Sequence, residues 1–384
     1  MEKNVLFSEI ERLYEKYLKV WEDVCNIESP TGYKKGVDEC GQYFIDRASE
    51  FGWQIEVLPQ NISGNPICIT MNSESNNTAI CLSGHIDTVH PLGAFGSPTV
   101  RFDDQKIYGP GVNDCKGGVV GALYAMEVLH NCGFIDRPVK LLIQTDEENS
   151  SKTSNKDTIK WICEKAQGTR AFLNLECYDK GMVCVERKGI VTFLFKIQGV
   201  EAHSSFCAIS GANAILEASH KIIELEKFKD NEGITASCNI ISGGTAPNTV
   251  AGYCEVVCNV RFATVEQLEF IKSEAQKIAD TVFVDGCETE LEIQSFRVSM
   301  EKFDRNLKLV EELNDCFEAF GLPRHKPSKR MGGSDAADVN AAGLTVVDSM
   351  GVEGEGIHST KEFGYKESLK ECAKRIVAAV CGLI

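Results

Sequence analysis

Histidines and carboxylates follow several of the apolar segments that this sequence predicts to be buried strands. The segment SGHIDTVHP comes directly after the apolar run TAICL, so His85 and Asp87 lie where a strand ends. They point to the same side, because side chains alternate along a strand. Taken alone, such a pair is more often a hydrogen-bonded structural pair than a metal site. The rest of the chain decides between these two interpretations.

Other acids and one more imidazole occupy comparable positions. Asp114 lies in the glycine-rich loop GPGVNDCKGG before a helix, and Glu147 and Glu148 follow the apolar strand PVKLLIQT. Glu176 follows RAFLNL, and His358 follows LTVVDSM in the segment GVEGEGIHS. Loops after the carboxyl ends of strands share one edge of an α/β sheet, where such folds carry their sites. We therefore expect these side chains to converge.

Two imidazoles and three carboxylates suit two ions of the Zn²⁺ class, with one carboxylate able to bridge them. In two-metal hydrolytic sites the ions lie about 3.5–4 Å apart and share a water. In the doublet, one carboxylate would bind a metal and its neighbour would take the proton of the water. Asp87 would then accept the other ring N–H of His85 and fix its tautomer. The combination favours a metal site, although an acidic doublet by itself is usually solvated surface charge.

Length and charge limit the classes of protein. A chain of 384 residues exceeds what one hydrophobic core usually serves, so two domains are expected. The formal charge of −16 has the wrong sign for a nucleic-acid or anionic-membrane binder. We do not expect the charged N-terminal segment to be a signal peptide, and no stretch of about 18 apolar residues predicts a membrane span. The 17 scattered cysteines, without a CxxC pair, are typical of reduced thiols in a cytoplasmic protein.

Hydrophobic periodicity predicts the elements that position these residues. Helices are expected over 6–24, 33–51, 119–130 and 157–166, and strands over 54–59, 66–71, 78–82, 138–145 and 170–175. Alternating helices and apolar strands predict a doubly wound α/β sheet covered on both faces. From 188 to 297 the order becomes βαββαβ, the ferredoxin-like arrangement. We expect a catalytic domain of residues 1–187 and 298–384 with an inserted domain of residues 188–297.

The motifs resemble those of the co-catalytic zinc exopeptidases over nearly the whole chain. SGHIDTV, GPGVNDCKGG, TDEE, NLE, GVEAHSS, MGGSDAAD and GIHS occur in the order and spacing of that family. It includes glutamate carboxypeptidase, aminoacylase, acetylornithine deacetylase and succinyl-diaminopimelate desuccinylase. The chain is most similar to the bacterial glutamate carboxypeptidases, through YGPGVND, TDEEN, VERKGIVTF and VVDSMGVEGEGIHS. The resemblance implies two Zn²⁺ per subunit, with Co²⁺ or Mn²⁺ as substitutes, and an inserted lid domain through which a homodimer forms.

The resemblance also assigns roles to the candidate ligands. It implies that the ions are held as follows: His85 and Glu176 on one, Glu148 and His358 on the other, and Asp114 bridging both. Glu147 would be the general base, and a cis peptide bond would follow Asp114. His203, in GVEAHSS, would be the lid histidine that reaches the active site of the partner subunit and stabilises the oxyanion. Without the resemblance, His203 is most simply an exposed surface histidine.

Substrate binding is implied for residues of the lid and its neighbourhood. Arg261, in NVRF, matches the family's arginine for the substrate carboxylate, and Asn248, in APNTV, matches a nearby polar contact. Arg330 precedes MGGSD, where the glutamate carboxypeptidases also carry an arginine. A guanidinium grips a carboxylate through two parallel hydrogen bonds, whereas the alternative is a surface salt bridge. Gly332 and Gly333 would let the backbone approach a ligand closely.

Two segments depart from the family pattern. ENSSKTSNKD, after the doublet, lacks the glycine-serine-rich turn that the family leads us to expect. Cys115 stands where aspartate or methionine is commoner, which leaves a thiol beside the metals that can bind Zn²⁺ adventitiously or be oxidised. Neither departure removes a ligand.

These features predict a zinc metallopeptidase or amidohydrolase acting on a small peptide or N-acyl amino acid with a free carboxylate, glutamate or a relative being preferred. One alternative is a deacylase of the acetylornithine or succinyl-diaminopimelate type, which would share the metal site. The other is a non-catalytic metal-binding scaffold derived from the same fold.

Overall fold

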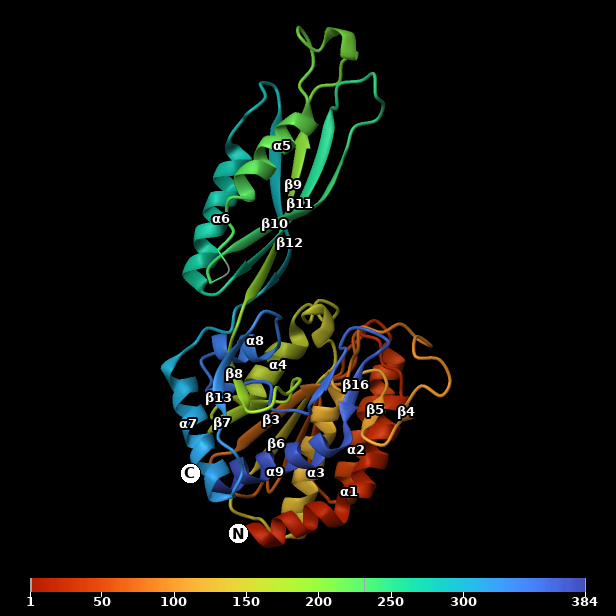
Figure 1. Ribbon diagram of the computed structural model, residues 1–384, viewed down its shortest axis with the longest axis vertical. Coiled ribbons are helices and arrows are strands. Elements are labelled where there is room, and N and C mark those ends of the chain that lie inside the picture. The colour runs from red at the N-terminus through yellow and green to blue at the C-terminus, as the bar shows by residue number, and fades with distance from the viewer. Residues whose placement is uncertain (1, 231, 384) are drawn as a thin grey trace. The chain divides into compact units, whose positions relative to one another are not determined.

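The computed structural model describes residues 2–230 and 232–383, which form two compact units (Figure 1). The first unit comprises Met1–Val185, Lys302–Lys329 and Ser334–Ile384, and the second comprises Glu186–Glu301 and Arg330–Gly333. The segment Arg330–Gly333 therefore groups with the second unit, whereas the sequence had assigned it to the first. The reason is local hydrogen bonding: Arg187 Nη1 donates to the carbonyls of Gly332 and Gly333 at 3.1 and 3.3 Å.

The first unit contains a six-stranded mixed sheet. Its strand order is β1-β2-β6-β3-β7-β14. The pairings of β6, β3, β7 and β14 are parallel, whereas β1 and β2 add an antiparallel edge. The bounds are β1 Gln54–Val57, β2 Ile67–Met71, β3 Ile80–His85, β6 Val139–Gln144, β7 Ala171–Asn174 and β14 Val346–Val347. The prediction of a mixed α/β fold is thus confirmed.

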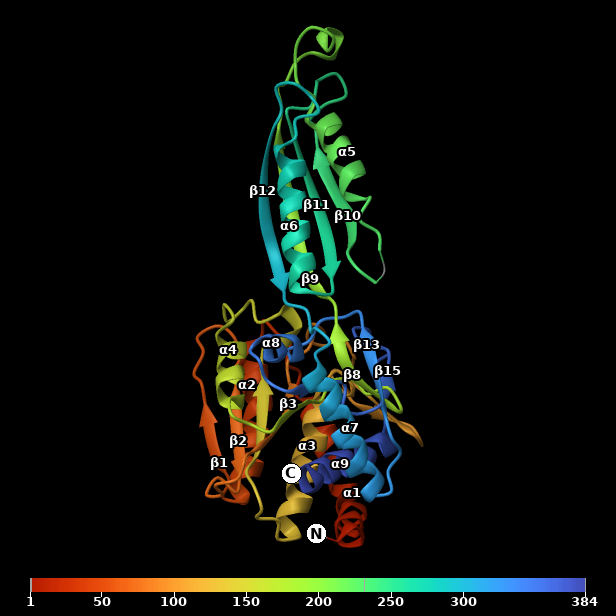
Figure 2. The ribbon, with the colours of Figure 1, turned by 90° about the vertical axis from the view of Figure 1, so that its left-hand side faces the viewer.

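Helices cover both faces of this sheet, as Figure 2 shows. One face carries α1 (Lys3–Asn26), α2 (Lys34–Glu50), α3 (Lys116–Asn131), α7 (Asp304–Ala319) and α9 (Lys366–Gly382). The other carries α4 (Asp157–Ala166) and α8 (Ala336–Ala341). In keeping with a sheet that is covered on both sides, every residue of β2 and β3 is buried.

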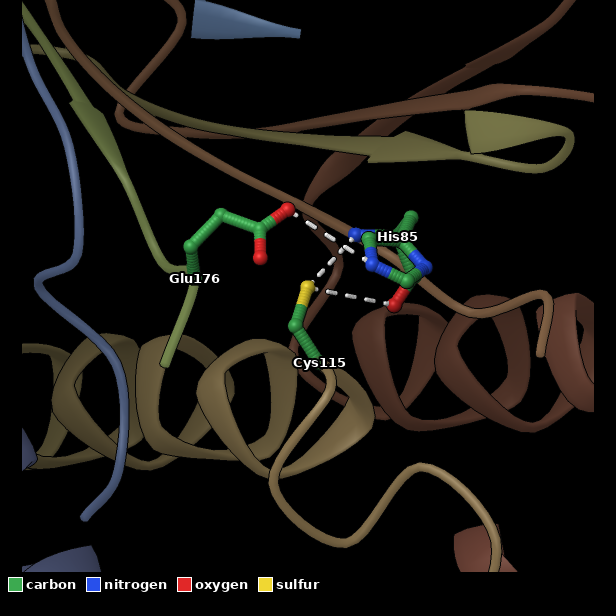
Figure 3. A group of neighbouring side chains, drawn as sticks. All are labelled: His85, Cys115 and Glu176. Carbon is green, nitrogen blue, oxygen red and sulfur yellow. Dashed lines mark hydrogen bonds and ion pairs between the residues drawn. The ribbon is translucent and has the colours of Figure 1, made fainter. Parts of the chain in front are cut away.

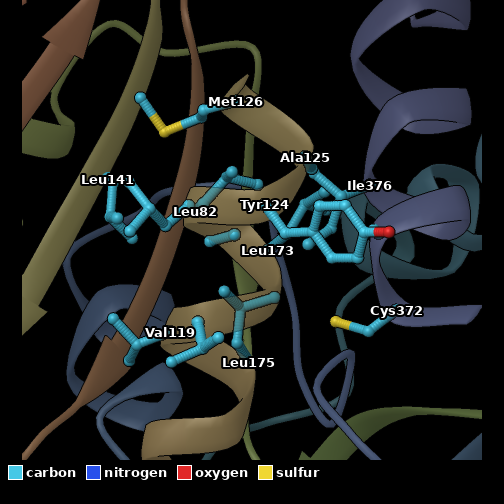
Figure 4. Close-up of a cluster of buried hydrophobic side chains, with 14 of the residues drawn as sticks. Leu82, Val119, Tyr124, Ala125, Met126, Leu141, Leu173, Leu175, Cys372 and Ile376 are labelled. Atoms are coloured by element: carbon cyan, nitrogen blue, oxygen red, sulfur yellow. The ribbon is translucent and has the colours of Figure 1, made fainter. Parts of the chain in front are cut away.

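Helix α3 is buried on all sides between the sheet and the outer helices. Every residue from Lys116 to Leu129 is buried. Figure 4 shows Val119 and Met126 toward the strand residues Leu82 and Leu141, while Tyr124 faces α9. Each buried side chain of this size stabilises the fold by about 1.5–3 kcal/mol relative to exposure. This packing fixes the start of α3, which directly follows Asp114 and Cys115.

The second unit has the element order β9 (Gly189–Gln198), α5 (Ala214–Leu225), β10 (Thr235–Gly243), β11 (Tyr253–Phe262), α6 (Val265–Asp280) and β12 (Glu288–Arg297). Its antiparallel sheet has the order β10-β11-β9-β12, with both helices packed on the sheet. In β11 fully buried residues alternate with more accessible ones from Cys254 to Phe262. The unit therefore has its own core, in which Phe193, Val256 and Ile271 take part.

Several short elements had no counterpart in the sequence-based prediction. One sheet combines β15 (Gly354–Glu355), β16 (Phe363–Tyr365), β5 (Lys106–Tyr108) and β4 (Arg101–Phe102). Another pairs β13 (Lys326–Arg330) with β8 (Met182–Arg187). Two single-turn 3₁₀ helices are η1 (Glu147–Asn149) and η2 (Ser204–Phe206). Across residues 2–230 and 232–383, none of the helices has the length and apolar character needed to cross a membrane.

Candidate metal centre

The register of the central strands brings the candidate ligands to one edge of the sheet. His85 is the last residue of β3 and pairs with Gln144, the last residue of β6. Ser83 pairs with Asn174, which ends β7. The three parallel strands therefore end at nearly the same level. The doublet that begins at Glu147 and the carboxylate of Glu176 follow these ends within three residues.

Asp114 lies between the two histidines. Its Oδ1 is 3.2 Å from His85 Nε2, and its Oδ2 is 3.3 Å from His358 Nε2. The outer carboxylates complete each side, with Glu176 Oε1 at 3.6 Å from His85 Nε2 and Glu148 Oε2 at 3.2 Å from His358 Nε2. The structure thus brings together all five side chains that the sequence nominated as metal ligands.

These separations fit the coordination shells of two metal ions. Nitrogen and oxygen ligands that lie about 2.0–2.1 Å from a tetrahedral Zn²⁺ are about 3.3 Å from each other. The four distances, from 3.2 to 3.6 Å, are close to that value. One oxygen of Asp114 belongs to each group, so this carboxylate has the geometry of a bridge. The donor set of imidazole and carboxylate suits Zn²⁺ and related ions.

The imidazoles and carboxylates of this centre shift one another's pKa values. Burial raises the pKa of Glu148 to about 7, against the hydrogen bond with His358. Hydrogen bonds with Asp114 and Glu148 raise the pKa of His358 to about 10. Burial also opposes ionisation of Asp114, yet hydrogen bonds from His358 and His85 hold its pKa well below the usual range. The buried carboxylates therefore favour a positive charge at the imidazole positions, which a proton or a bound metal ion can supply.

Asp87 connects the end of β3 to the acidic doublet. Its Oδ1 accepts the backbone N–H of Glu147 and its Oδ2 accepts that of Glu148, both at 3.1 Å. Thr31 Oγ1 donates to Oδ2 at 2.8 Å. His85 Nδ1 is 3.0 Å from the backbone carbonyl of Asp87 and 3.4 Å from its carboxylate. The sequence predicted that the Asp87 carboxylate accepts the ring N–H of His85; in the structure the backbone carbonyl of Asp87 is the nearer acceptor, and the carboxylate, at 3.4 Å from the ring, also accepts both N–H groups of the doublet.

Glu362 fixes the loop that carries Asp114, and sequence reasoning missed it. Its buried carboxylate accepts the backbone N–H groups of Gly111, Asn113 and Asp114 at 3.2, 2.9 and 3.0 Å. His90 Nε2 lies 3.1 Å from the same carboxylate. A cis peptide bond follows Asp114 in this loop. The only sequence signal was the position of Glu362 in the segment after GIHS, which no periodicity marks.

His358 has an unusual backbone conformation. Its φ is 58°, in the left-handed region that residues other than glycine seldom adopt. Such conformations persist only where the surrounding structure holds them, and they are concentrated at functional sites. The backbone directs the half-exposed imidazole of His358 to Asp114 and Glu148.

Two buried thiols adjoin the ligands. Cys115 Sγ accepts the backbone N–H of His85 at 3.0 Å, and Cys177 Sγ donates to the carbonyl of Asn113 at 3.6 Å. Burial raises the pKa of both thiols well above the ordinary value. Figure 3 shows Cys115 together with His85 and Glu176.

The predicted lid residues belong to the second unit. His203 is exposed, and its Nδ1 accepts the backbone N–H of Ser205 at 3.2 Å. Nε2 therefore carries the proton when the imidazole is neutral. Asn248 is exposed, and its carbonyl accepts the backbone N–H of Ser204 at 2.9 Å. Arg261 is half-buried, and its Nε donates to Asn259 Oδ1 at 3.2 Å.

The remaining candidate substrate residues lie at the end of β13 and just beyond it. Arg330 is the last residue of that strand, and its carbonyl accepts the backbone N–H of Lys188. A Cβ on Gly333 would lie 2.6 Å from Cδ of Arg297, so the close approach at this glycine is to a side chain of the same unit. Gly332 is less constrained, with only Arg187 Nη1 within 4 Å of such a Cβ.

Comparison with known proteins identifies the family. Residues 81–381 match the pattern of peptidase family M20/M25/M40. The chain is 25% identical to carboxypeptidase G2 of Pseudomonas sp. (strain RS-16), over 93% of this chain and 86% of that protein. It is also 25% identical to succinyl-diaminopimelate desuccinylase of Rickettsia felis (strain ATCC VR-1525 / URRWXCal2), over 69% of this chain and 73% of that protein.

A solved structure supports the same fold. The Bacillus subtilis YXEP protein, described as a dinuclear metal-binding peptidase of family M20, superposes with a TM-score of 0.73 at 15% identity. The match covers 97% of this chain and 99% of that chain. With the family pattern extending over most of the sequence, the chain belongs to peptidase family M20/M25/M40 and is a metal-dependent hydrolase.

Proposed function

We propose that the protein is a di-zinc amidohydrolase that releases an amino acid with a free carboxylate, glutamate or a relative of it, from a peptide or N-acyl precursor. The observation that carries the proposal is Asp114, whose two carboxylate oxygens lie 3.2 and 3.3 Å from imidazoles of two separate ligand groups. His85 and Glu176 would hold one ion, and Glu148 and His358 the other.

Bound metal ions supply a water of lowered pKa and polarise the scissile carbonyl. Glu147 is the general base that takes the proton from the attacking water and passes it to the leaving amine. The backbone of Glu147 is tied to Asp87, and that of Glu148 to the other oxygen of the same carboxylate. Because both backbones are fixed in this way, the two side chains can take different roles: Glu148 binds a metal ion and Glu147 transfers the proton.

His203 stabilises the oxyanion that develops on the substrate carbonyl. Its Nδ1 is already engaged by Ser205 N–H, so Nε2 is the nitrogen that offers a proton. A positioned donor of this kind is worth about 3–4 kcal/mol of transition-state stabilisation. We propose that the second unit is the lid and the dimerisation domain, and that His203 acts in the active site of the partner subunit.

Arg261 is the proposed anchor for the substrate carboxylate. The hydrogen bond from its Nε to Asn259 orients the guanidinium. Within the described residues its terminal nitrogens have no acidic partner, so both remain available for a bidentate contact. Asn248, Arg330 and the backbone at Gly332 and Gly333 are proposed to complete the substrate pocket.

The test is the release of free amino acid from a panel of dipeptides, N-acyl amino acids and folyl-glutamate. The protein is loaded with Zn²⁺ or Co²⁺ and compared with and without chelator. Chelator-sensitive release of glutamate supports the proposal. Two bound metals without release from any substrate would overturn it and favour the scaffold interpretation.

A deacylase of acyl-ornithine or succinyl-diaminopimelate is the second candidate, favoured by the likeness to succinyl-diaminopimelate desuccinylase. Release confined to those substrates would keep the metal centre and replace the glutamate preference. For either substrate class, Arg261→Lys tests the carboxylate anchor, because it keeps the charge but loses the planar fork. If Arg261 grips the carboxylate, this variant raises KM for the accepted substrate and leaves the bound metal unchanged.

A further inference from the structure

Cys115 lies within reach of one of the two proposed metal positions. Its sulfur, a ring nitrogen of His85 and a carboxylate oxygen of Glu176 all lie within 4.8 Å of one another, and all three residues are buried. Figure 3 shows the sulfur pointing from the start of α3 toward the Glu176 carboxylate and His85. We infer that Cys115 is a thiolate ligand of the ion held by His85 and Glu176. This inference rests on the proposed di-metal function.

Local structure keeps the sulfur in this position. The backbone N–H of His85 donates to Sγ at 3.0 Å, and the thiol in turn reaches the carbonyl of His85 at 3.6 Å. When the thiol binds a cation it loses its proton to solvent and a metal–sulfur bond forms. The hydrogen bond from His85 N–H is compatible with the thiolate and stabilises its charge. Only the weaker contact with the carbonyl is given up.

The neighbouring residues make room for sulfur. A Cβ on Gly84 would come within 3.2 Å of Cys115 Sγ and 2.8 Å of Val119 Cγ2, so glycine at this position leaves space for the thiol. Helix α3, which begins directly after Cys115, is buried throughout and fixes the position of the Cys115 backbone. The position of the sulfur is therefore set by the backbone of α3 and by the space beside Gly84.

A thiolate changes which metals the centre prefers. Thiolate ligands select Zn²⁺ and other soft ions, whereas carboxylates and imidazoles alone also accommodate Mn²⁺. If Cys115 is a ligand, the two metal positions differ in their ligand atoms, because the ion between Glu148 and His358 has only nitrogen and oxygen ligands. We expect the His85 position to discriminate against Mn²⁺ more strongly than the His358 position.

X-ray absorption of the zinc-loaded full-length protein tests the inference without any measurement of turnover. A Zn–S shell at about 2.3 Å, beside nitrogen and oxygen at about 2.0–2.1 Å, is expected. Because the sulfur binds only one of the two zinc ions, the expected mean sulfur count is half a ligand per zinc. Two bound zinc ions with only nitrogen and oxygen neighbours would overturn the role of Cys115 and leave the proposed hydrolase intact.

Variants identify the sulfur. Cys115→Ser should lose the Zn–S shell and the sulfur-to-metal charge-transfer absorption of the Co²⁺ protein, with a greater loss of Zn²⁺ than of Mn²⁺ affinity. Cys177→Ser is the matched control, since Cys177 is a second buried thiol and forms a candidate group with Asp114 and Glu176. A shell that survives in Cys115→Ser and disappears in Cys177→Ser would refute the assignment. A Zn–S shell in a protein that hydrolyses no substrate would support the inference and refute the proposed function.

Discussion

At the scale of single residues, Glu147 and Glu148 are anchored through their backbone N–H groups, so their side chains can have different roles. Asp87 receives both N–H groups of the doublet, and the two peptide units therefore have fixed orientations. Glu148 reaches His358, whereas Glu147 is buried at the start of the 3₁₀ turn η1. Adjacent carboxylates can in this way serve as metal ligand and proton acceptor.

Replacing Glu147 by glutamine should separate metal binding from turnover. The amide cannot accept the proton of the water, so kcat is expected to fall by about 10²–10⁴-fold. Elemental analysis should still find two metals per chain. Glu148→Gln is the matched control, because it alters the adjacent residue and should reduce metal occupancy as well as activity. Substantial turnover by the Glu147→Gln protein would refute the assignment of the base.

The sequence indicates which candidate ligands converge, but it does not indicate the residues that support them, for a physical reason. Candidate ligands such as His85 and Glu176 lie at or just after the ends of apolar strands, and the shared edge of an α/β sheet brings such positions together. Their supports come from distant segments without any pattern. Thr31, which donates to Asp87, lies 56 residues before it, and Glu362 lies 248 residues after Asp114. Only the folded chain makes these contacts visible.

At the scale of elements, the loop before α3 depends on one carboxylate from the segment before β16. Glu362→Gln should therefore weaken Zn²⁺ binding by about 10–100-fold, as the loss of an outer hydrogen-bonding partner usually does. The amide supplies a single acceptor oxygen where the carboxylate accepts from three backbone N–H groups. Competition with a chromogenic chelator measures the affinity. Glu355→Gln, an exposed residue of the neighbouring strand β15, should leave it unchanged; an equal loss in that variant would contradict a specific role for Glu362.

A second element-scale prediction concerns His325, just before β13. Burial, with the nearby charge of Arg375, lowers the pKa of His325 to about 4. Its Nε2 is 2.6 Å from the hydroxyl of Tyr178, and both residues line a cavity of about 510 Å³. The native imidazole is neutral, whereas the unfolded one titrates near 6.5. The unfolded state therefore binds more protons between about pH 4 and 6.5, and stability falls as the pH falls through this window.

The His325→Gln variant should lose this part of the pH dependence. The full shift corresponds to about 3 kcal/mol of unfolding free energy between pH 7 and pH 4. Urea unfolding of metal-free wild type and variant at several pH values measures it, because contributions of other groups cancel in the difference. The same substitution at the exposed His220 is the control. Parallel pH profiles for wild type and His325→Gln would contradict the buried neutral histidine.

The elements themselves differ in how readily the sequence indicates them. Long helices such as α1 and α6 repeat their apolar residues often enough to be predicted. The strands β4, β5, β15 and β16 have two or three residues each, so no period can be read from them. They form because segments far apart in the chain pair with one another, as Gly364 does with Ile107.

At the scale of the whole molecule, the second unit has the construction of an insertion. The segments through which its chain enters and leaves lie side by side, where the backbones of Arg187 and Met300 exchange two hydrogen bonds of 3.0 Å. Each unit has its own hydrophobic core, one around α3 and the other between β9, β11 and the helices α5 and α6. A domain with its own core and neighbouring ends can fold independently.

Excision should therefore give two folded proteins with different properties. Residues 186–301 alone should unfold cooperatively in urea, although they lack the stabilising contacts of Arg330–Gly333. The complementary chain, with Val185 joined to Lys302 by a short glycine linker, should still bind two Zn²⁺, because all five proposed ligands lie in the first unit. It should have no measurable turnover, since His203 and Arg261 are absent. Full turnover by the complementary chain would show that the metal centre needs neither residue, and the proposed roles of His203 and Arg261 would then be wrong.

Sedimentation of the excised unit tests the proposed dimer. Association of residues 186–301 supports the proposed dimerisation domain, whereas a monomer at all concentrations contradicts it.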